Sequence, residues 1–150
     1  MSAPSKVALE AKIWTPAGDG SWLDLHQIVV HLRWMRDFYN VQRVRFDPHM
    51  FHYAAQILSD EGLWLEPFPQ TDERMAPASM RTYDLIVTEA AEHNGDPDFA
   101  DHMSSANTKP VSDRSWRITK RGAAGQMDAC VAAVMAAPLA SEYHAAPGVE

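Results

Sequence analysis

The chain has 150 residues, a net charge of −7 and a pI near 5.4, so it amounts to about one domain and is not a generally basic protein that coats nucleic acid. Apolar residues make up 46% and charged residues 22%, a balance that supports a buried core and argues against disorder as the overall state. The single cysteine, Cys130, excludes an intramolecular disulfide and fits a reducing compartment.

The first part of the chain predicts a strand, a loop and a helix. Residues 6–14 alternate apolar and more polar side chains, which is typical of a strand with one wetter face. Residues 15–20 are rich in proline and glycine and predict a loop. Asp24 is a suitable N-cap for a helix over 25–39 with one apolar face.

The middle of the chain predicts two more strands and two more helices. Residues 41–46 predict a short strand that ends at Asp47, and Pro48 suits the first turn of a helix that Gly62 closes. Residues 63–68 predict a third strand. Residues 77–91 predict a helix with a broad apolar face.

The last third predicts a short helix over 96–106, a hairpin over 107–119 and a helix over 126–137. The order of strand and helix through the chain, followed by a hairpin and a final helix, indicates an α/β layer sandwich. The pattern does not fix the order of the strands in the sheet.

Charge is distributed unevenly. Residues 84–101 hold six acidic and no basic side chains, whereas residues 109–121 hold five basic side chains and one acidic side chain. Basic side chains around Trp116 on a hairpin could bind a nucleic-acid backbone. Alternatively, they are the solvated charges that protect a hairpin edge from aggregation.

Asp47 is the first candidate functional residue. It lies where a strand stops and a helix begins, at the edge of the sheet where α/β folds commonly carry their working groups. Its alternative role is simply to cap the helix, since aspartate followed by proline is a good start signal.

Asp128 is the second candidate. It lies at the start of a predicted helix of small and apolar residues that should be largely buried, and a buried carboxylate needs a partner or a cation. Alternatively it occupies the first turn, where the helix dipole favours an anion.

Two such carboxylates would suit Mg²⁺ or Mn²⁺, which prefer oxygen ligands. Two ions roughly 4 Å apart can activate water and stabilise the leaving oxygen in phosphodiester cleavage, although two carboxylates alone are too few ligands. Alternatively, Asp47 could bind a transition metal together with His49 and His52. Histidines at this spacing are more often ordinary, partly buried helix residues.

Several segments together resemble the large terminase subunits of tailed bacteriophages. They occur in the right order between about residues 7 and 137. The two most specific are a strand followed by Asp-Pro and a nearby aromatic residue, and a helix of the form Asp-Ala-x-Val-Ala-x-x-Met-Ala. The segments are 11–16 (AKIWTP), 45–51 (RFDPHMF), 61–63 (EGL), 69–78 (PQTDERMAPA), 93–97 (HNGDP), 116–121 (WRITKR) and 127–136 (MDACVAAVMA).

The resemblance implies an α/β nuclease domain of ribonuclease-H-like fold, a mixed sheet flanked by helices, which cuts concatemeric double-stranded DNA during genome packaging. In this family clustered acidic residues bind Mg²⁺ or Mn²⁺. By position, Asp47 and Asp128 match the catalytic, metal-binding acids that follow the central strand and begin the C-terminal helix. Arg117, Lys120 and Arg121 are expected near DNA phosphates.

The chain also departs from the family pattern. It starts at what resembles the third strand, so the first strands, which carry another essential aspartate, and the ATPase domain are expected to lie elsewhere. Residues 122–126 are neutral where the family tends to carry lysine and arginine. These departures leave a rival function open, that of a non-catalytic binding or assembly module of the packaging motor.

We therefore expect a flexible N-terminus at 1–5, a terminase nuclease-like domain at 6–137 and a C-terminal tail at 138–150. The expected partners are double-stranded DNA, an upstream terminase fragment with the ATPase domain, the portal and the small terminase, in the host cytoplasm. The sequence contains no run of about 20 apolar residues, which is the length that a membrane-spanning helix needs, so no membrane span is predicted.

Overall fold

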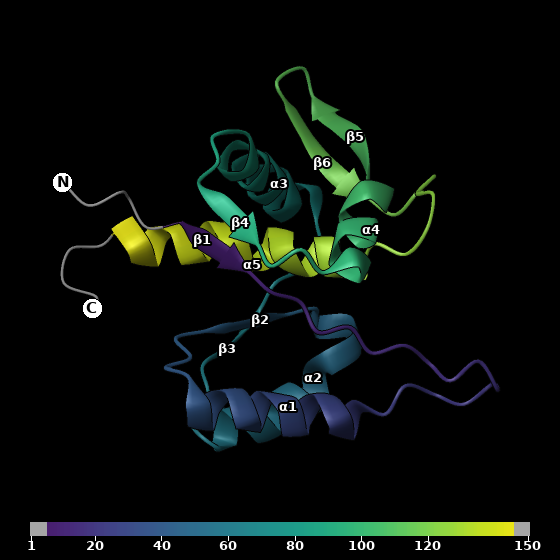
Figure 1. Ribbon diagram of the computed structural model, residues 1–150, viewed down its shortest axis with the longest axis vertical. Helices are drawn as coiled ribbons and strands as arrows, with labels where there is room; N and C mark the ends of the chain where they lie inside the picture. The colour runs from purple at the N-terminus through teal and green to yellow at the C-terminus, as the bar shows by residue number, and fades with distance from the viewer. Residues whose placement is uncertain (1–5, 146–150) are drawn as a thin grey trace. The chain divides into compact units, whose positions relative to one another are not determined.

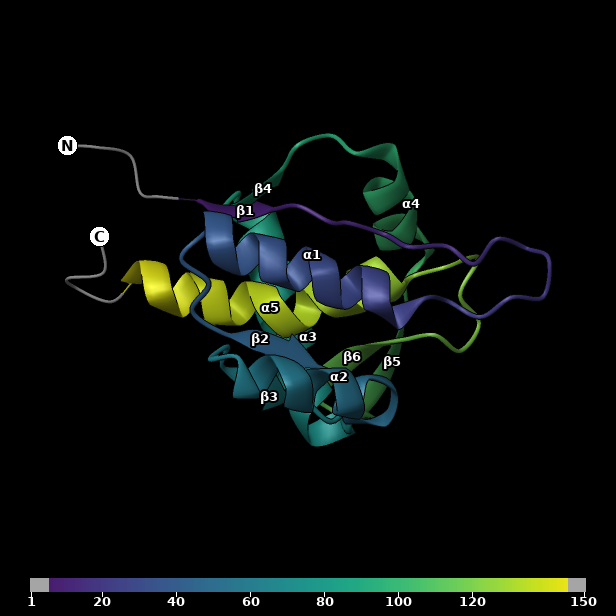
Figure 2. The same ribbon diagram turned by 90° about the horizontal axis from the view of Figure 1, so that it is seen from below.

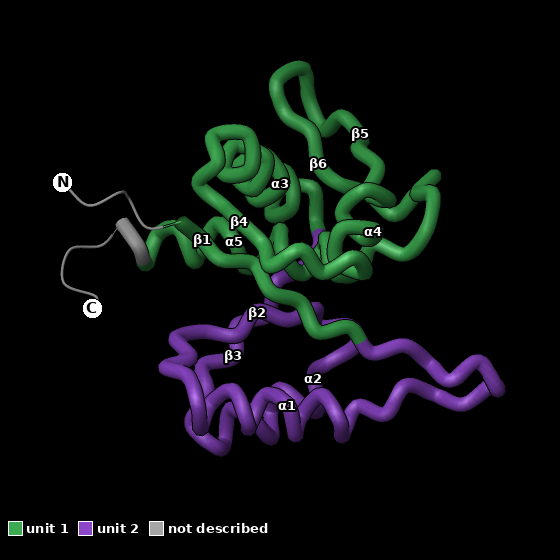
Figure 3. Tube along the Cα trace, viewed as in Figure 1, with its two compact units in different colours: residues 1–13, 71–150 green, residues 14–70 purple. Residues whose placement is uncertain are grey.

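The computed structural model describes residues 6–145, and the expectations for 1–5 and 146–150 lie outside the described residues. The chain divides into two compact units, one formed by the residues up to Ile13 and from Thr71 onward, the other by Trp14–Gln70 (Figure 3). We describe each unit by itself and call them unit 1 and unit 2. No helix within the described residues has the length and apolarity that a membrane span needs.

Unit 2 contains two strands and two helices, in the order α1 (Leu25–Phe38), β2 (Val44–Phe46), α2 (Pro48–Asp60) and β3 (Leu65–Pro67). The strands pair in parallel, with Val44 opposite Leu65. The core of unit 2 contains buried side chains from both helices and from the turn after α2. Val29 comes from α1, Ala54 and Leu58 come from α2, and Leu63 follows the turn. Gly62 has φ +98°, a conformation that lets the chain turn from α2 toward β3.

The predicted start of α1 is confirmed. Asp24 is its N-cap, and its side chain accepts a hydrogen bond from the backbone N–H of His26 at 2.9 Å. The segment between residue 14 and α1 extends beyond the first turn of that helix as a long arm (Figures 1 and 2). Trp22 in this arm is 95% exposed, so the arm makes no core of its own.

Two ion-pair groups stabilise unit 2. The guanidinium of Arg33 on α1 donates to both carboxylate oxygens of Glu61 just after α2, with Nε–Oε2 2.9 Å, and these hydrogen bonds hold the pKa of Glu61 below its usual range. Arg43 and Arg45 converge on Glu66 of β3, at 2.9 and 3.2 Å. The first group connects α1 to the end of α2, and the second links β2 and the residue before it to β3.

Unit 1 contains the other seven elements: β1 (Val7–Leu9), α3 (Asp72–Val87), β4 (Ala91–His93), α4 (Pro97–Ser105), β5 (Asn107–Ser112), β6 (Ser115–Thr119) and α5 (Asp128–Ala145). β1 and β4 pair in parallel, and β5 and β6 form an antiparallel hairpin. α3 packs against β6 and α5, and α5 also contacts α4 and β1 (Figure 1). The buried face of α5 supplies Ala129 and Ala133 to a cluster with Phe99.

In unit 1 two predicted helix boundaries are wrong and one strand was not predicted. The helix predicted from residue 77 begins at Asp72, because Thr71 caps it and Pro77 lies inside it. Strand β4 was not predicted, since its three residues owe their conformation to pairing with β1. The last helix runs to Ala145 and not to residue 137, because Ala137 and Leu139 on either side of Pro138 are buried and keep the helix packed.

Candidate functional site

Asp47 joins the end of β2 to the start of α2. Its Oδ1 accepts a hydrogen bond from the backbone N–H of His49 at 3.0 Å. Its carbonyl oxygen accepts from the N–H groups of Met50 and Phe51, both at 3.3 Å. The capping role predicted for Asp47 is therefore confirmed, and Pro48 occupies the first turn as expected.

Asp47 also has a contact that the sequence did not reveal. The side-chain amide of Gln70 donates to Asp47 Oδ2 at 3.2 Å. Gln70 follows β3, and the parallel pairing of β2 with β3 brings the carboxyl ends of both strands to one edge. Each carboxylate oxygen thus accepts one hydrogen bond, which fixes the orientation of a half-buried group and leaves further lone pairs for a cation.

Asp128 is the first residue of α5 and lies in unit 1. Its side chain is 60% exposed, so the prediction of a buried carboxylate is wrong; the alternative, a place in the first turn, is the one observed. The helix begins at Asp128 itself, so the carboxylate stays at the surface where the helix dipole favours a negative charge.

Two side chains surround the start of α5. Lys120, which follows β6, forms an ion pair with Asp128 Oδ1. His102 of α4 accepts a hydrogen bond at Nδ1 from the backbone N–H of Ala129, at 3.0 Å. His102 therefore satisfies one of the free N–H groups of the first turn. No local pattern of residues predicts this contact, because it depends on how α4 packs against α5.

Asp47 and Asp128 belong to different units, so a shared cleft between them stays a prediction. Within residues 6–145, no group of three or more His, Cys, Asp and Glu side chains is placed to hold a metal ion. The reading that joined Asp47 to His49 and His52 finds no support, and both histidines are exposed.

The basic hairpin is tied to α3. Arg117 donates to Asp72 Oδ1 at 3.0 Å, Lys109 lies 3.4 Å from the same oxygen, and the Arg117 side chain is only 12% exposed. The hydrogen bond from Arg117 holds the pKa of Asp72 below its usual range, with Lys109 adding to the effect. Arg121 is exposed and forms no ion pair among the described residues. Arg117 thus has a structural partner, whereas Arg121 faces solvent.

Cys130 lies two residues after Asp128 and is buried. Burial raises the pKa of its thiol to about 11, so the thiol is protonated at neutral pH and is not a nucleophile there.

The comparisons with known proteins agree with this architecture. Residues 5–143 match the family described as terminase large subunit, endonuclease domain. The chain belongs to this family. A search of curated proteins gave no match.

A solved structure supports the fold of this terminase endonuclease domain. The structure titled "Crystal structure of the HK97 bacteriophage large terminase" superposes with a TM-score of 0.66 at 20% sequence identity. The match covers 75% of this chain and 24% of that chain. The expected α/β fold of ribonuclease-H type is therefore confirmed, and the chain spans about a quarter of the large terminase that it matches.

Proposed function

We propose that this terminase domain is a metal-dependent endonuclease that cuts concatemeric double-stranded DNA during genome packaging. The observation that carries the proposal is the placement of Asp47 at the end of a strand and of Asp128 at the first residue of a helix, in a chain of the terminase endonuclease family. We assign both residues as metal-binding and catalytic.

The residues present fit Mg²⁺ or Mn²⁺. Both candidates offer carboxylate oxygens, the donors that these ions prefer. Asp47 is held by the His49 backbone and by Gln70, so its free lone pairs have a fixed direction. Asp128 is exposed and already forms an ion pair with Lys120, so its position accepts a positive charge. When bound there, such an ion would supply an activated water and stabilise the charge on the leaving oxygen.

The surrounding side chains have separate tasks in this proposal. Gln70 positions Asp47 by holding Oδ2. Lys120 neutralises Asp128 when no cation is bound and becomes available to a DNA phosphate when one is. Arg121, next to it and exposed, is a second phosphate contact. The largely buried, paired side chain of Arg117 supports the hairpin and is the least accessible of the three predicted DNA-binding groups.

Two carboxylates offer too few oxygens for two ions, so we propose that a further acidic group from another polypeptide segment completes the centre. The proposed partners are double-stranded DNA, a terminase polypeptide with an ATPase domain, the portal and the small terminase, and the place of action is the host cytoplasm.

Plasmid nicking with Mn²⁺ tests this function, with the chain alone and with an added terminase segment that carries the further acid. Asp47→Asn and Asp128→Asn should each abolish nicking, since asparagine has nearly the same shape, can still cap α2 at position 47 and removes the charge at both positions. Asp60→Asn and Asp113→Asn, both at exposed positions outside the proposed centre, are the matched controls and should cut normally.

Nicking that survives Asp47→Asn or Asp128→Asn would overturn the site. DNA binding without nicking under every condition would instead favour the rival function, a non-catalytic assembly module.

A further inference from the structure

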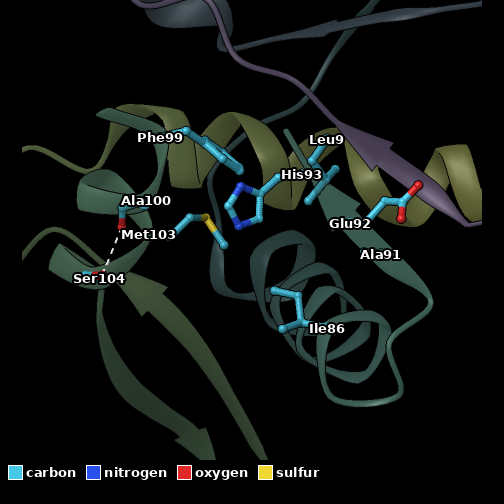
Figure 4. A pocket seen from close by; sticks show the side chains of 9 residues that line it. All are labelled: Leu9, Ile86, Ala91, Glu92, His93, Phe99, Ala100, Met103 and Ser104. Atoms are coloured by element: carbon cyan, nitrogen blue, oxygen red, sulfur yellow. Dashed lines mark hydrogen bonds between the residues drawn. The ribbon is translucent and has the colours of Figure 1, made fainter. Parts of the chain in front are cut away.

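Unit 1 contains a pocket of about 290 Å³ between the end of α3, strand β4 and helix α4 (Figure 4). Its lining is mainly apolar and includes Leu9, Ile86, Ala91, Phe99, Ala100 and Met103. The volume is at the small end of the range for ligand sites, about 300–1,000 Å³. A pocket of this size suits one large apolar side chain better than a cofactor.

His93 points into the middle of this pocket (Figure 4). Its Nδ1 accepts the backbone N–H of Gly95 at 3.0 Å, and its ring meets the edge of Phe99 with centroids 5.9 Å apart. These two contacts fix the ring. Its Nε2 bonds to no described residue, so it is available to a carbonyl oxygen of an incoming peptide.

The elements that build the pocket carry negative charge that no ion pair offsets within residues 6–145, and one of the acidic residues, Glu92, lines the pocket itself. All six acidic residues of the 84–101 segment lie on them or on the turns between them, and none forms an ion pair within residues 6–145; they are Asp84, Glu89, Glu92, Asp96, Asp98 and Asp101. An apolar pocket with acidic surroundings attracts cationic segments and repels phosphate.

We infer that this pocket docks a segment of a partner protein in which one large apolar side chain is flanked by lysine or arginine. The apolar side chain fills the space beside Phe99 and Met103, and the flanking cations meet the acidic residues around it. A second copy of this chain is a poorer occupant, because Trp116 and Ile118, the two largest apolar side chains of its basic hairpin, already pack within unit 1: Trp116 meets the ring of Tyr83 and Ile118 is buried. The inference does not depend on the nuclease assignment.

Three blocked hexapeptides test the inference: Arg-Lys-Leu-Phe-Arg-Lys, the acidic counterpart Glu-Asp-Leu-Phe-Glu-Asp, and Arg-Lys-Ser-Ser-Arg-Lys without apolar anchors. Each is titrated into the full chain carrying ¹³C-methyl methionine. Only the first should shift the Met103 methyl signal and leave that of Met50, which lies exposed in unit 2. The affinity should fall as salt is raised, because the flanking charges are exposed.

Variants of the chain then distinguish the contribution of the apolar pocket to peptide binding from that of the acidic residues. The measurement is the binding of the fluorescein-labelled basic apolar peptide. Ala100→Phe fills the pocket and should abolish binding, whereas Ala136→Phe on an exposed position of α5 should not. If Ala100→Phe fails to fold, Met103→Gln replaces it as the pocket variant; it makes the lining polar and should also abolish binding. Glu92→Gln with Asp101→Asn should weaken binding about two- to fivefold, and Asp60→Asn with Asp113→Asn should have no effect.

Three results would overturn the inference: equal binding of the acidic peptide, no response of Met103 to the basic apolar peptide, or unchanged binding to both pocket variants. A change in the mass of the chain in solution that Ala100→Phe abolishes would show that a second copy is the occupant, which also contradicts the proposal.

Discussion

Lys120 and Asp128 form an ion pair that links the end of the β5–β6 hairpin to the first residue of α5. Both side chains are 60% exposed, so the pair is worth at most about 1 kcal/mol. A weak, exposed partner at a carboxylate is easily displaced. The ion pair therefore offsets the charge of Asp128, and the carboxylate can still exchange Lys120 for another cation.

The first prediction concerns competition for Asp128. If Asp128 is a metal ligand, a cation must displace Lys120 before it binds. Lys120→Gln should therefore tighten Mn²⁺ binding by about two- to fivefold, the equivalent of a weak exposed pair. Calorimetric titration with Mn²⁺ measures this.

Lys109→Gln is the control, because Lys109 pairs with Asp72 and not with Asp128. Equal tightening by both variants would reflect net charge alone and would contradict a specific role for Lys120.

The second prediction concerns DNA. Each phosphate contact on duplex DNA contributes a slope of about −0.9 to the logarithm of affinity against that of salt. Lys120→Ala with Arg121→Ala should flatten the slope by about two units, measured by fluorescence anisotropy with a duplex. Arg117→Ala should leave the slope unchanged, because its guanidinium is held by Asp72 and its side chain is only 12% exposed. A slope that responds to Arg117 and not to the other two would refute this assignment.

The third prediction concerns the pH dependence of stability. The pKa of Asp72 is lowered in the folded state, chiefly by the hydrogen bond from Arg117. A carboxyl group with a lowered folded pKa stabilises the fold above its unfolded value of about 3.9 and loses that contribution as the pH falls through the folded value. Asp72→Asn should thus lower the urea midpoint at pH 7, and the difference from the parent should shrink below pH 4. A difference that is the same at both pH values would show that the ion pair does not contribute.

The fourth prediction concerns Cys130. A buried thiol with a pKa of about 11 has very little thiolate at pH 8. Its reaction with a disulfide reagent should be at least roughly a hundredfold slower in the folded chain than in guanidinium chloride, where the pKa returns to about 8.5. Similar rates in the two conditions would mean that the start of α5 opens readily.

Local chemistry decided which features could be predicted. The start of α2 was predicted because Asp47 and Pro48 are adjacent and their effects on the helix end are local. The start of α3 was misplaced because the helix was predicted to begin at residue 77; Thr71 followed by Asp72 and Glu73 is the signal that locates it, an N-cap with acidic residues in the first turn. Tertiary contacts could not be predicted. Gln70 meets Asp47 only through the pairing of β2 with β3, and His102 meets α5 only through packing of α4.

The burial of Asp128 was misjudged for a similar reason. The small and apolar residues after it do form a buried helix, with Cys130, Val134 and Ala137 at most 3% exposed. The helix nevertheless begins at Asp128, so the carboxylate lies at the edge of that apolar surface. An error of two residues in a helix boundary changed a buried charge into an exposed one.

The proposed nuclease centre requires that Asp47 and Asp128 bind metal ions together. The most direct measurement is an anomalous difference map from crystals of the chain grown with Mn²⁺ and a short DNA duplex. If both residues are ligands, the map should contain anomalous peaks within coordination distance of carboxylate oxygens from both, and Asp128→Asn should remove these peaks. Peaks bound by only one of the two, or the two carboxylates on opposite faces of the molecule, would contradict it.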